Sequence, residues 1–230
     1  GTNAIIEYFG PGSKTISCTG KATITNMGAE LGATTSVFSY DDRMNTYLRS
    51  TNRSALADLA DQNQEILQQD AEVLKNPGDY FDTVVEIDLS KLEPHVAGPH
   101  SPDRVRPISK LAEEVRDVNN DLVDEISTAL IGSCTNSSYE DMTRAADVAT
   151  QAYRHGATVA SELMVTPGSE QIRATIERDG QMARLKDIEA TVLANACGPC
   201  IGQWKREKVM DGVPNTIVTS YNRNFPRRND

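Results

Sequence analysis

The sequence predicts an α/β protein made of three-layer α/β/α units with parallel-rich sheets. Two observations carry this prediction. Short β-branched runs alternate with amphipathic segments along the chain, which favours a parallel sheet covered on both faces. The chain also has 230 residues, 38% of them apolar, enough to bury a core in one or two domains. No apolar run reaches the length of about 18 residues that a membrane-spanning helix needs.

The alternation is clearest in the second part of the chain. Ser137 and Glu140 form an S-x-x-E pattern that predicts a helix start, and Gly156 fits the stop of that helix. Ser169 opens a further helix that runs through Ile176. The β-branched runs between these helices predict strands over 127–133, 159–165, 191–194 and 216–220.

The first part alternates too and predicts a second α/β unit. Helical character is expected over 22–32 and 54–74, the latter rich in polar residues. Strands are expected over 15–18, 34–38 and 83–87.

A proline-rich segment separates the two parts. Residues 93–109 contain four prolines, which forbid a continuous helix or a central strand there. The sequence therefore predicts a first unit over 1–92, a linker over 93–109 and a second unit over 110–230. Because the chain starts at Gly1 and stops inside a polar run at Asp230, we expect it to be part of a longer protein.

The net charge limits the classes of binding partner, and the cysteine spacing indicates the redox compartment. The formal net charge of −10 argues against a nucleic-acid partner, and a small anionic substrate would need locally placed arginines. The four cysteines are not spaced like a secreted disulfide framework, so free thiols in a reducing compartment are expected.

Three of the four cysteines carry the chemistry of the chain. Cys134 follows one predicted strand, and Cys197 and Cys200 follow another. Asn222 and Arg223 follow a third. Ligands of open parallel sheets bind beyond the carboxyl ends of the strands, so these loops are expected to meet at one edge. Three thiolates leave one coordination position of a metal centre open, as a catalytic site requires.

The C-x-x-C pair alone leaves alternatives open. A redox dithiol normally has an aromatic residue before the first cysteine and a helix that starts there, whereas Ala196 precedes Cys197 and Gly202 disfavours a helix start. None of the three histidines has the spacing of a zinc ligand. Cys18 is expected to be a small buried core residue. An iron–sulfur cluster with one exposed iron is the interpretation favoured by three cysteines.

Several long blocks resemble the aconitase family, and together they extend over essentially the whole chain. They are NMGAELGATT at 26–35, IGSCTNSSYED at 131–141, TPGSEQIRATIERDG at 166–180, ANACGPCIGQW at 194–204 and SYNRNF at 220–225. The GQW ending is more similar to the mitochondrial or bacterial citrate-cycle type than to isopropylmalate isomerase or the iron-regulatory cytosolic form.

The resemblance implies a hydro-lyase that isomerises citrate and isocitrate through cis-aconitate. It implies the aconitase iron–sulfur domain type of fold, with 1–92 as domain 2 and 110–230 as a truncated domain 3. A [4Fe–4S] cluster would be held by Cys134, Cys197 and Cys200. The other implied site residues are Arg223 and Arg228, which would grip substrate carboxylates, and Asn26, Glu30 and Asn222, which would surround the cluster and its water.

The same resemblance implies the surroundings of the enzyme. A tricarboxylate partner, no membrane partner, a monomer at full length and a location in the mitochondrial matrix or bacterial cytoplasm are expected. No segment matches the family's general-base serine or its Asp–His pairs, so residues 1–230 alone should not turn over citrate.

The chain departs from the family pattern at three places. Pro226-Arg227 stands where family members carry a small pair before Arg228, so Arg227 competes for that role. The early histidine near Phe9 and a cysteine near Thr25 are absent, and the region 62–79 is longer than usual.

Two alternatives remain open at the level of the sequence. One is a related hydro-lyase: homoaconitase, a methylcitrate or 2-methylisocitrate dehydratase, or isopropylmalate isomerase. The other is a non-catalytic RNA-binding regulator of the same fold, against which the acidic balance argues.

Overall fold

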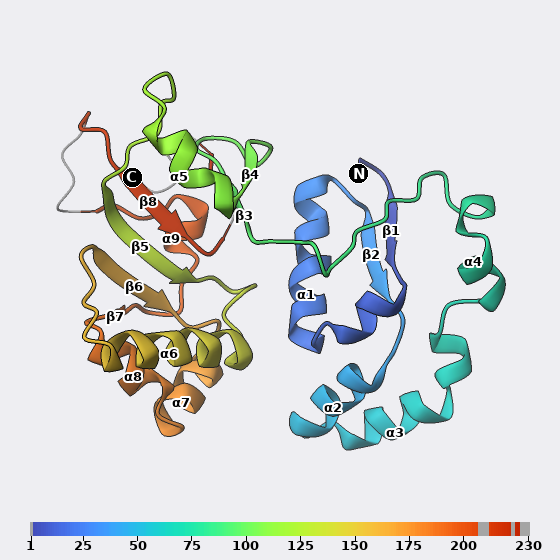
Figure 1. Cartoon of the computed structure of the whole chain (residues 1–230). Coiled ribbons are helices and arrows are strands. Elements are labelled where there is room, and N and C mark those ends of the chain that lie inside the picture. Colours follow the sequence, from blue (N-terminus) through green and yellow to red (C-terminus); the bar gives the residue numbers. More distant parts are fainter. Residues whose placement is uncertain (1, 207–211, 222–223, 226–230) are drawn as a thin grey trace. The chain divides into compact units, whose positions relative to one another are not determined.

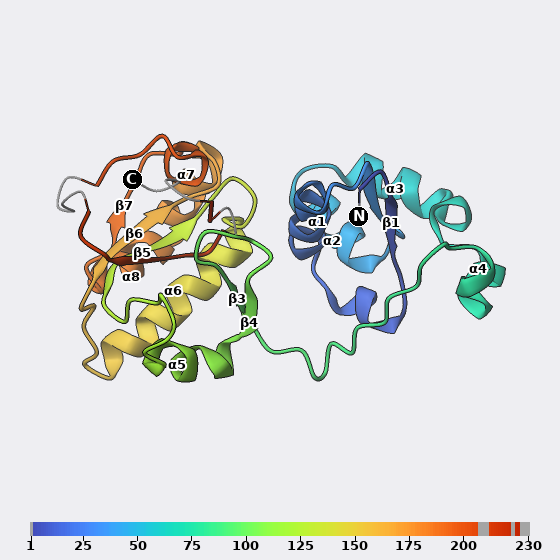
Figure 2. The same ribbon diagram turned by 90° about the horizontal axis from the view of Figure 1, so that it is seen from above.

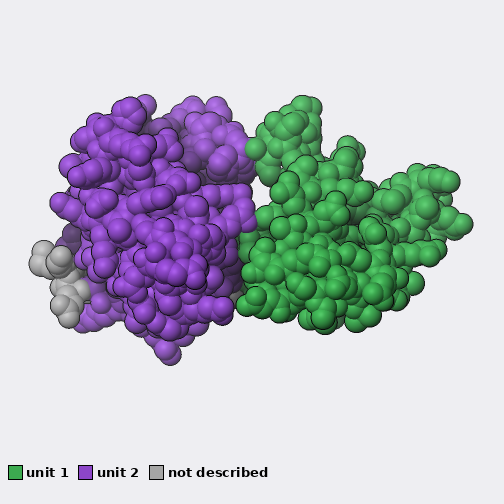
Figure 3. Space-filling view, turned by 90° about the horizontal axis from the view of Figure 1, so that it is seen from below, with its two compact units in different colours: residues 1–92 green, residues 93–230 purple. Residues whose placement is uncertain are grey.

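The computed structural model describes residues 2–206, 212–221, 224 and 225. The chain divides into two compact units, unit 1 over 1–92 and unit 2 over 93–230 (Figures 1, 2 and 3). Both are mixed α/β structures with parallel strands, which confirms the predicted fold class. No described helix is long and apolar enough to cross a membrane.

Unit 1 is built around a two-stranded parallel sheet. Strand β1 (Ile5–Tyr8) pairs with β2 (Thr35–Phe38), and Tyr8 and Phe38 stack with their ring centroids 4.7 Å apart. The helices of the unit are α1 (Cys18–Met27), α2 (Asp42–Ser50), α3 (Ser54–Gln62) and α4 (Ala71–Lys75), with 3₁₀ turns η1 (Pro11–Thr15), η2 (Gly28–Leu31), η3 (Gln64–Leu67) and η4 (Pro77–Asp79).

The structure confirms part of the expectation for unit 1. The strand over 34–38 is β2, and the helix over 22–32 corresponds to α1 and η2. The strand expected over 15–18 is wrong, because Ser17 caps α1 by accepting a hydrogen bond from the Gly20 N–H at 3.1 Å. The segment 83–87 is not a strand either, since it pairs with no described strand. The helical character over 54–74 is broken into α3, η3 and α4.

Unit 2 contains a four-stranded sheet in which all neighbours are parallel. Its order is β7 (Thr191–Val192), β6 (Glu162–Thr166), β5 (Ile126–Gly132) and β8 (Thr216–Thr219). All four strands fall within the runs predicted from the sequence or extend them by one residue. The helices are α5 (Ile108–Arg116), α6 (Tyr139–Arg154), α7 (Glu170–Arg178), α8 (Gln181–Asp187) and α9 (Gly198–Ile201).

Helix α6 begins one residue later than predicted. Its cap is Ser138, whose hydroxyl accepts a hydrogen bond from the Asp141 N–H at 3.2 Å while Asp141 accepts one from the Ser138 N–H at 3.0 Å. Ser137 does not cap, because its hydroxyl accepts a hydrogen bond from the Ser133 N–H at 2.6 Å instead. The predicted cap at Ser169 is confirmed for α7.

The core of unit 2 lies on both faces of this sheet. Val165 packs with buried residues of α6, α7 and α8, which lie together along one side in Figure 1. Because side chains alternate along a strand, the buried Leu130, Met164 and Thr166 point to the opposite face. Burial of both faces agrees with the continuous apolar strands of a parallel sheet.

The segment 93–109, predicted as a linker, has secondary structure of its own and groups with unit 2. Strand β3 (His95–Ala97) pairs antiparallel with β4 (Val105–Pro107). The buried Arg106 side chain holds this hairpin, since its Nη1 donates to Gly98 O and its Nε to Glu114 of α5, each at 2.6 Å. The prolines are accommodated because they stand before, between and at the end of the two short strands.

Candidate functional site

The carboxyl ends of the four parallel strands in unit 2 meet at one edge of the sheet. Cys134 follows β5 in the sequence, and Cys197 and Cys200 follow β7. Strand β6 lies between β5 and β7, so these two strands are about 10 Å apart at the sheet, a span that loops can bridge. The predicted placement of the cysteine loops at a common edge is therefore present in the topology.

The turn that carries Cys134 is fixed by short polar side chains. The N–H groups of Thr135 and Asn136 donate to Ser133 Oγ at 3.2 and 3.3 Å, and Ser133 Oγ donates to Asn136 Oδ1 at 2.9 Å. These bonds fold residues 133–136 into a tight turn. Cys134 is exposed on it, while Ser133 and Ser137 on either side are buried.

The same turn is tied to the end of β8. Ser220 Oγ accepts a hydrogen bond from the Gly132 N–H at 2.8 Å, and Asn136 Nδ2 donates to the Ser220 carbonyl oxygen. Two ends of neighbouring strands are thus held together by side chains that the sequence analysis did not single out. A cluster of small polar residues directly after a β-branched run is the signal that could have found them.

Two glycines let the ends of β5 and β6 come close. Gly132 has φ +129°, and a Cβ there would overlap the backbone of Thr166. A Cβ on Gly168 would lie 2.7 Å from Ser137 O, the atom to which the Gly168 N–H donates at 3.1 Å. A side chain at either position would push the Cys134 turn away from β6.

The other two thiols lie at a short helix. Cys197 is the N-cap of α9 and is exposed, whereas Cys200 is buried and its Sγ donates to Cys197 O at 3.4 Å. The sequence predicts that Gly202 disfavours a helix start after Cys197, but a short helix begins there, and Gly202 ends it as the C-cap with φ +78°.

None of the four cysteines is in a disulfide, and the three thiols at the edge fit a thiolate-bound group in chemistry and in topology. Buried polar atoms at this edge fit as well: Thr166 Oγ1, at the end of β6, and Asn195 Oδ1, after β7, have no hydrogen-bond partner among the residues that the structure describes. Within the described residues, however, no three His, Cys, Asp or Glu side chains lie close enough together to hold a metal ion. The three thiols thus share one edge of the sheet without converging on a common point.

The remaining predicted site residues lie elsewhere. Asn26 is exposed in the last turn of α1 and lines a shallow hollow with Gly28 and Ser36, and Glu30 is half-buried in η2, both in unit 1. The predicted residues Asn222, Arg223 and Arg228 lie outside the described residues.

Cys18 is not the buried core residue that the sequence suggested. It is half-buried at the first position of α1, where partial burial raises the pKa of its thiol and the nearby Lys21 acts in the opposite direction. A raised pKa keeps this thiol protonated and makes it a poor ligand compared with a thiolate.

Known proteins resemble the chain over its whole length. It matches the aconitase family (aconitate hydratase) along residues 1–230. It is 55% identical over 230 residues to the mitochondrial aconitate hydratases of Schizosaccharomyces pombe and Aspergillus fumigatus, and 53% identical to a probable mitochondrial aconitate hydratase of Caenorhabditis elegans. These matches include 100% of the chain but only 28% of the two fungal proteins and 29% of the nematode protein.

Proposed function

The chain belongs to the aconitase family, and from this premise we propose that it carries the iron–sulfur part of an aconitate hydratase, a hydro-lyase that interconverts citrate and isocitrate through cis-aconitate. The family match over the whole chain and the relatives' names support this activity. The observation that carries it is the set of three free thiols in loops at one edge of a parallel sheet.

In this proposal Cys134, Cys197 and Cys200 hold a [4Fe–4S] cluster. Bound in this way, the cluster supplies a Lewis acid with one iron that no cysteine occupies. The other roles belong to residues of the chain itself. Cys200 has to give up its proton, and with it the 3.4 Å bond from its Sγ to Cys197 O, before it can act as a thiolate ligand.

The substrate would be held by guanidinium groups. Arg223 and Arg228 suit the carboxylates of a tricarboxylate because a guanidinium donates two parallel hydrogen bonds to a carboxylate. Local arginines are needed because the chain has a formal net charge of −10, which repels an anion. Asn26, Glu30 and Asn222 would orient water near the cluster through hydrogen bonds.

We further propose that the chain works within a longer polypeptide in mitochondria. Residues 1–92 and 110–230 would correspond to domains 2 and 3 of the family. The proton-transfer groups would come from the remainder of the polypeptide, since the chain spans 28% of the fungal relatives it matches.

A chimera tests the proposal directly. The 230 residues replace the matching segment of the Schizosaccharomyces pombe relative, to which they are 55% identical, and the purified protein is reconstituted anaerobically with iron and sulfide. We expect citrate turnover and, after mild oxidation, the electron paramagnetic resonance signal of a [3Fe–4S] cluster from loss of one iron.

Two serine variants give the test its controls. Cys134→Ser should abolish both the signal and the turnover, whereas Cys18→Ser, at the half-buried thiol of α1, should keep both. A cluster that survives Cys134→Ser unchanged, or a site that fills with zinc alone, would refute the assignment.

A further inference from the structure

One buried hydroxyl at the candidate site pairs with none of the described residues. Thr166, the last residue of β6, is 4% exposed, and within the described part of the chain its Oγ1 has no hydrogen-bond partner. Buried hydroxyl groups are normally paired, because an unpaired one loses its bonds to water without a replacement. An unpaired hydroxyl in a rigid strand therefore points to a partner that binds there.

Three features of the structure and the sequence fix the position of this hydroxyl. Thr166 is in register with Gly132 of β5, whose missing side chain lets the two backbones touch. Pro167 follows and restricts Thr166 to extended backbone. A β-branched side chain has few rotamers, so the Oγ1 direction is set before any ligand arrives.

The three thiols flank this position in the topology. The strand that ends at Thr166 lies between β5, which leads to Cys134, and β7, which leads to Cys197 and Cys200. The neighbouring Val165 packs into the core with α6, α7 and α8, so Thr166 faces the other side of the sheet. A group held between the two cysteine loops would lie over the end of the middle strand.

We propose that Thr166 is a positioning residue whose hydroxyl donates a hydrogen bond to a sulfur of the thiolate-held group at this sheet edge. The inference rests on the proposed function, because the acceptor is the sulfur of a bound cluster or of a ligating thiolate. Such a bond lowers the electron density on sulfur, which raises the reduction potential of a cluster and slows its oxidative loss. The hydroxyl would thus be unfavourable in the empty protein and favourable in the loaded one.

Valine tests this idea because it has nearly the shape of threonine without the hydroxyl. In the chimera described above, without cluster, Thr166→Val should raise the thermal unfolding midpoint, since it removes an unpaired buried polar group. After reconstitution the same variant should show a more negative reduction potential and lose its cluster in air several-fold faster. Thr166→Ser, which keeps a hydroxyl at this position, should show the reduction potential and the cluster lifetime of the wild type.

A second threonine provides the matched control. Thr216 starts β8, at the opposite edge of the sheet, and its Oγ1 donates to Val123 O at 2.6 Å. Thr216→Val should lower the unfolding midpoint, opposite to Thr166→Val, and should leave the reduction potential unchanged.

Each result has a distinct meaning. If Thr166→Val leaves potential and cluster lifetime as in the wild type, the inference is overturned although the cluster is present. An apo midpoint that falls as it does for Thr216→Val would overturn it too, because the hydroxyl would then have a partner within the protein. If the wild-type chimera takes up no cluster, the proposed function itself fails.

Discussion

The two units reach the same fold class with different interiors. Unit 2 buries apolar side chains from three helices and a four-stranded sheet, among them Met142, Val165 and Ile176. Within the described part of unit 1, Ala57 is the one apolar side chain that is fully buried, and a charged residue, Lys21, is buried beside a two-stranded sheet. Unit 1 also exposes Ile66 and Val85 to 79% and 76%.

The same α/β alternation is therefore stabilised in two different ways. A parallel sheet with both faces covered derives its stability from packed apolar volume, so unit 2 should be sensitive to cavities. A small sheet with little buried apolar area depends more on its polar contacts, so unit 1 should be sensitive to the loss of a charge partner. The chain's single tryptophan, Trp204, lies in unit 2, so its fluorescence reports on that unit alone.

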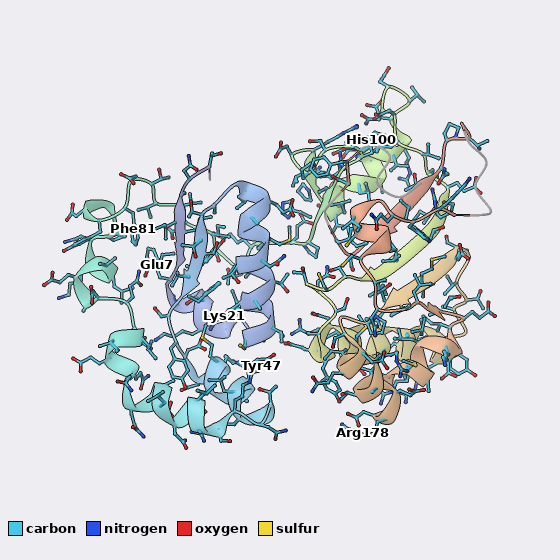
Figure 4. All side chains as sticks on the ribbon, turned by 180° about the vertical axis from the view of Figure 1, so that it is seen from behind. Glu7, Lys21, Tyr47, Phe81, His100 and Arg178 are labelled. Carbon is cyan, nitrogen blue, oxygen red and sulfur yellow. The ribbon has the colours of Figure 1, made fainter. Side chains whose placement is uncertain are left out.

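The largest expected effect follows from Asp41→Ala in unit 1. Lys21 Nζ, on α1 in Figure 4, pairs with Asp41 Oδ2 and is 3% exposed, and Asp41 Oδ1 caps α2 by accepting from the Met44 N–H at 3.1 Å. Loss of the carboxylate leaves a buried ammonium unpaired, which costs about 3–5 kcal/mol of unfolding free energy. Urea unfolding followed by far-ultraviolet circular dichroism should show the loss, with a smaller shift in Trp204 fluorescence.

An exposed pair in the same unit is the control. Asp58→Ala removes an ion pair with Arg49 whose two side chains are 58% and 42% exposed, so the loss should stay below about 1 kcal/mol. Equal losses from Asp41→Ala and Asp58→Ala would contradict the special role of the buried charge.

The second largest expected effect is in unit 2 and follows from the loss of packed side-chain volume. Ile176, on α7 in the unit 2 core, is fully buried, and Ile176→Ala should lower the unfolding free energy by about 2–5 kcal/mol because it removes packed atoms and leaves a cavity. The shift should be clear in the Trp204 fluorescence transition. The identical change at the exposed Ile66 of unit 1 should cost less than about 0.5 kcal/mol, and a comparable loss there would disprove the contrast.

The sequence was more informative about unit 2 than about unit 1, for a physical reason. Long β-branched runs buried on both faces, as in β5 and β6, carry a strong local signal. In unit 1 the run 83–87 is also rich in β-branched residues, but it pairs with no described strand and so completes no hydrogen-bonded ladder. Pairing is a tertiary property, so residue types alone could not distinguish the two cases.

The candidate site shows the same limit. Placement of the three cysteines at one edge followed from strand order and could be expected from the alternation of elements. The hydrogen bonds that fix the Cys134 turn to Ser220 join residues more than eighty positions apart, and nothing local in the sequence indicates them. The unpaired hydroxyl of Thr166 is equally invisible, because it depends on what surrounds the side chain.

The smallest expected effect is on the unfolding midpoint at low pH, and it again differs between the two units. In unit 2 the pKa of Asp179 is lowered by hydrogen bonds from Arg178, labelled in Figure 4, and from Tyr139 OH at 3.0 Å. In unit 1 the pKa of Asp88 is lowered by hydrogen bonds from the hydroxyl and N–H of Ser90. The Arg178 bonds join adjacent residues and, like the Ser90 bonds, can persist in the unfolded chain. The Tyr139 bond is formed only when α6 and α7 pack together, so it supplies the part of the shift that depends on folding.

The sign of the pH effect follows from the lowered pKa. A carboxyl group whose pKa is depressed by folding stabilises the protein above its unfolded pKa, and this contribution is lost as the pH falls below about 4. Asp179→Asn should therefore flatten the fall of the unfolding midpoint between about pH 5 and 3, while Asp88→Asn should leave it nearly unchanged because its bonds are local. Urea midpoints across this range decide the matter, measured by Trp204 fluorescence for Asp179→Asn in unit 2 and by far-ultraviolet circular dichroism for Asp88→Asn in unit 1. An equal flattening by both variants would show that the Ser90 turn, too, is formed only in the folded unit.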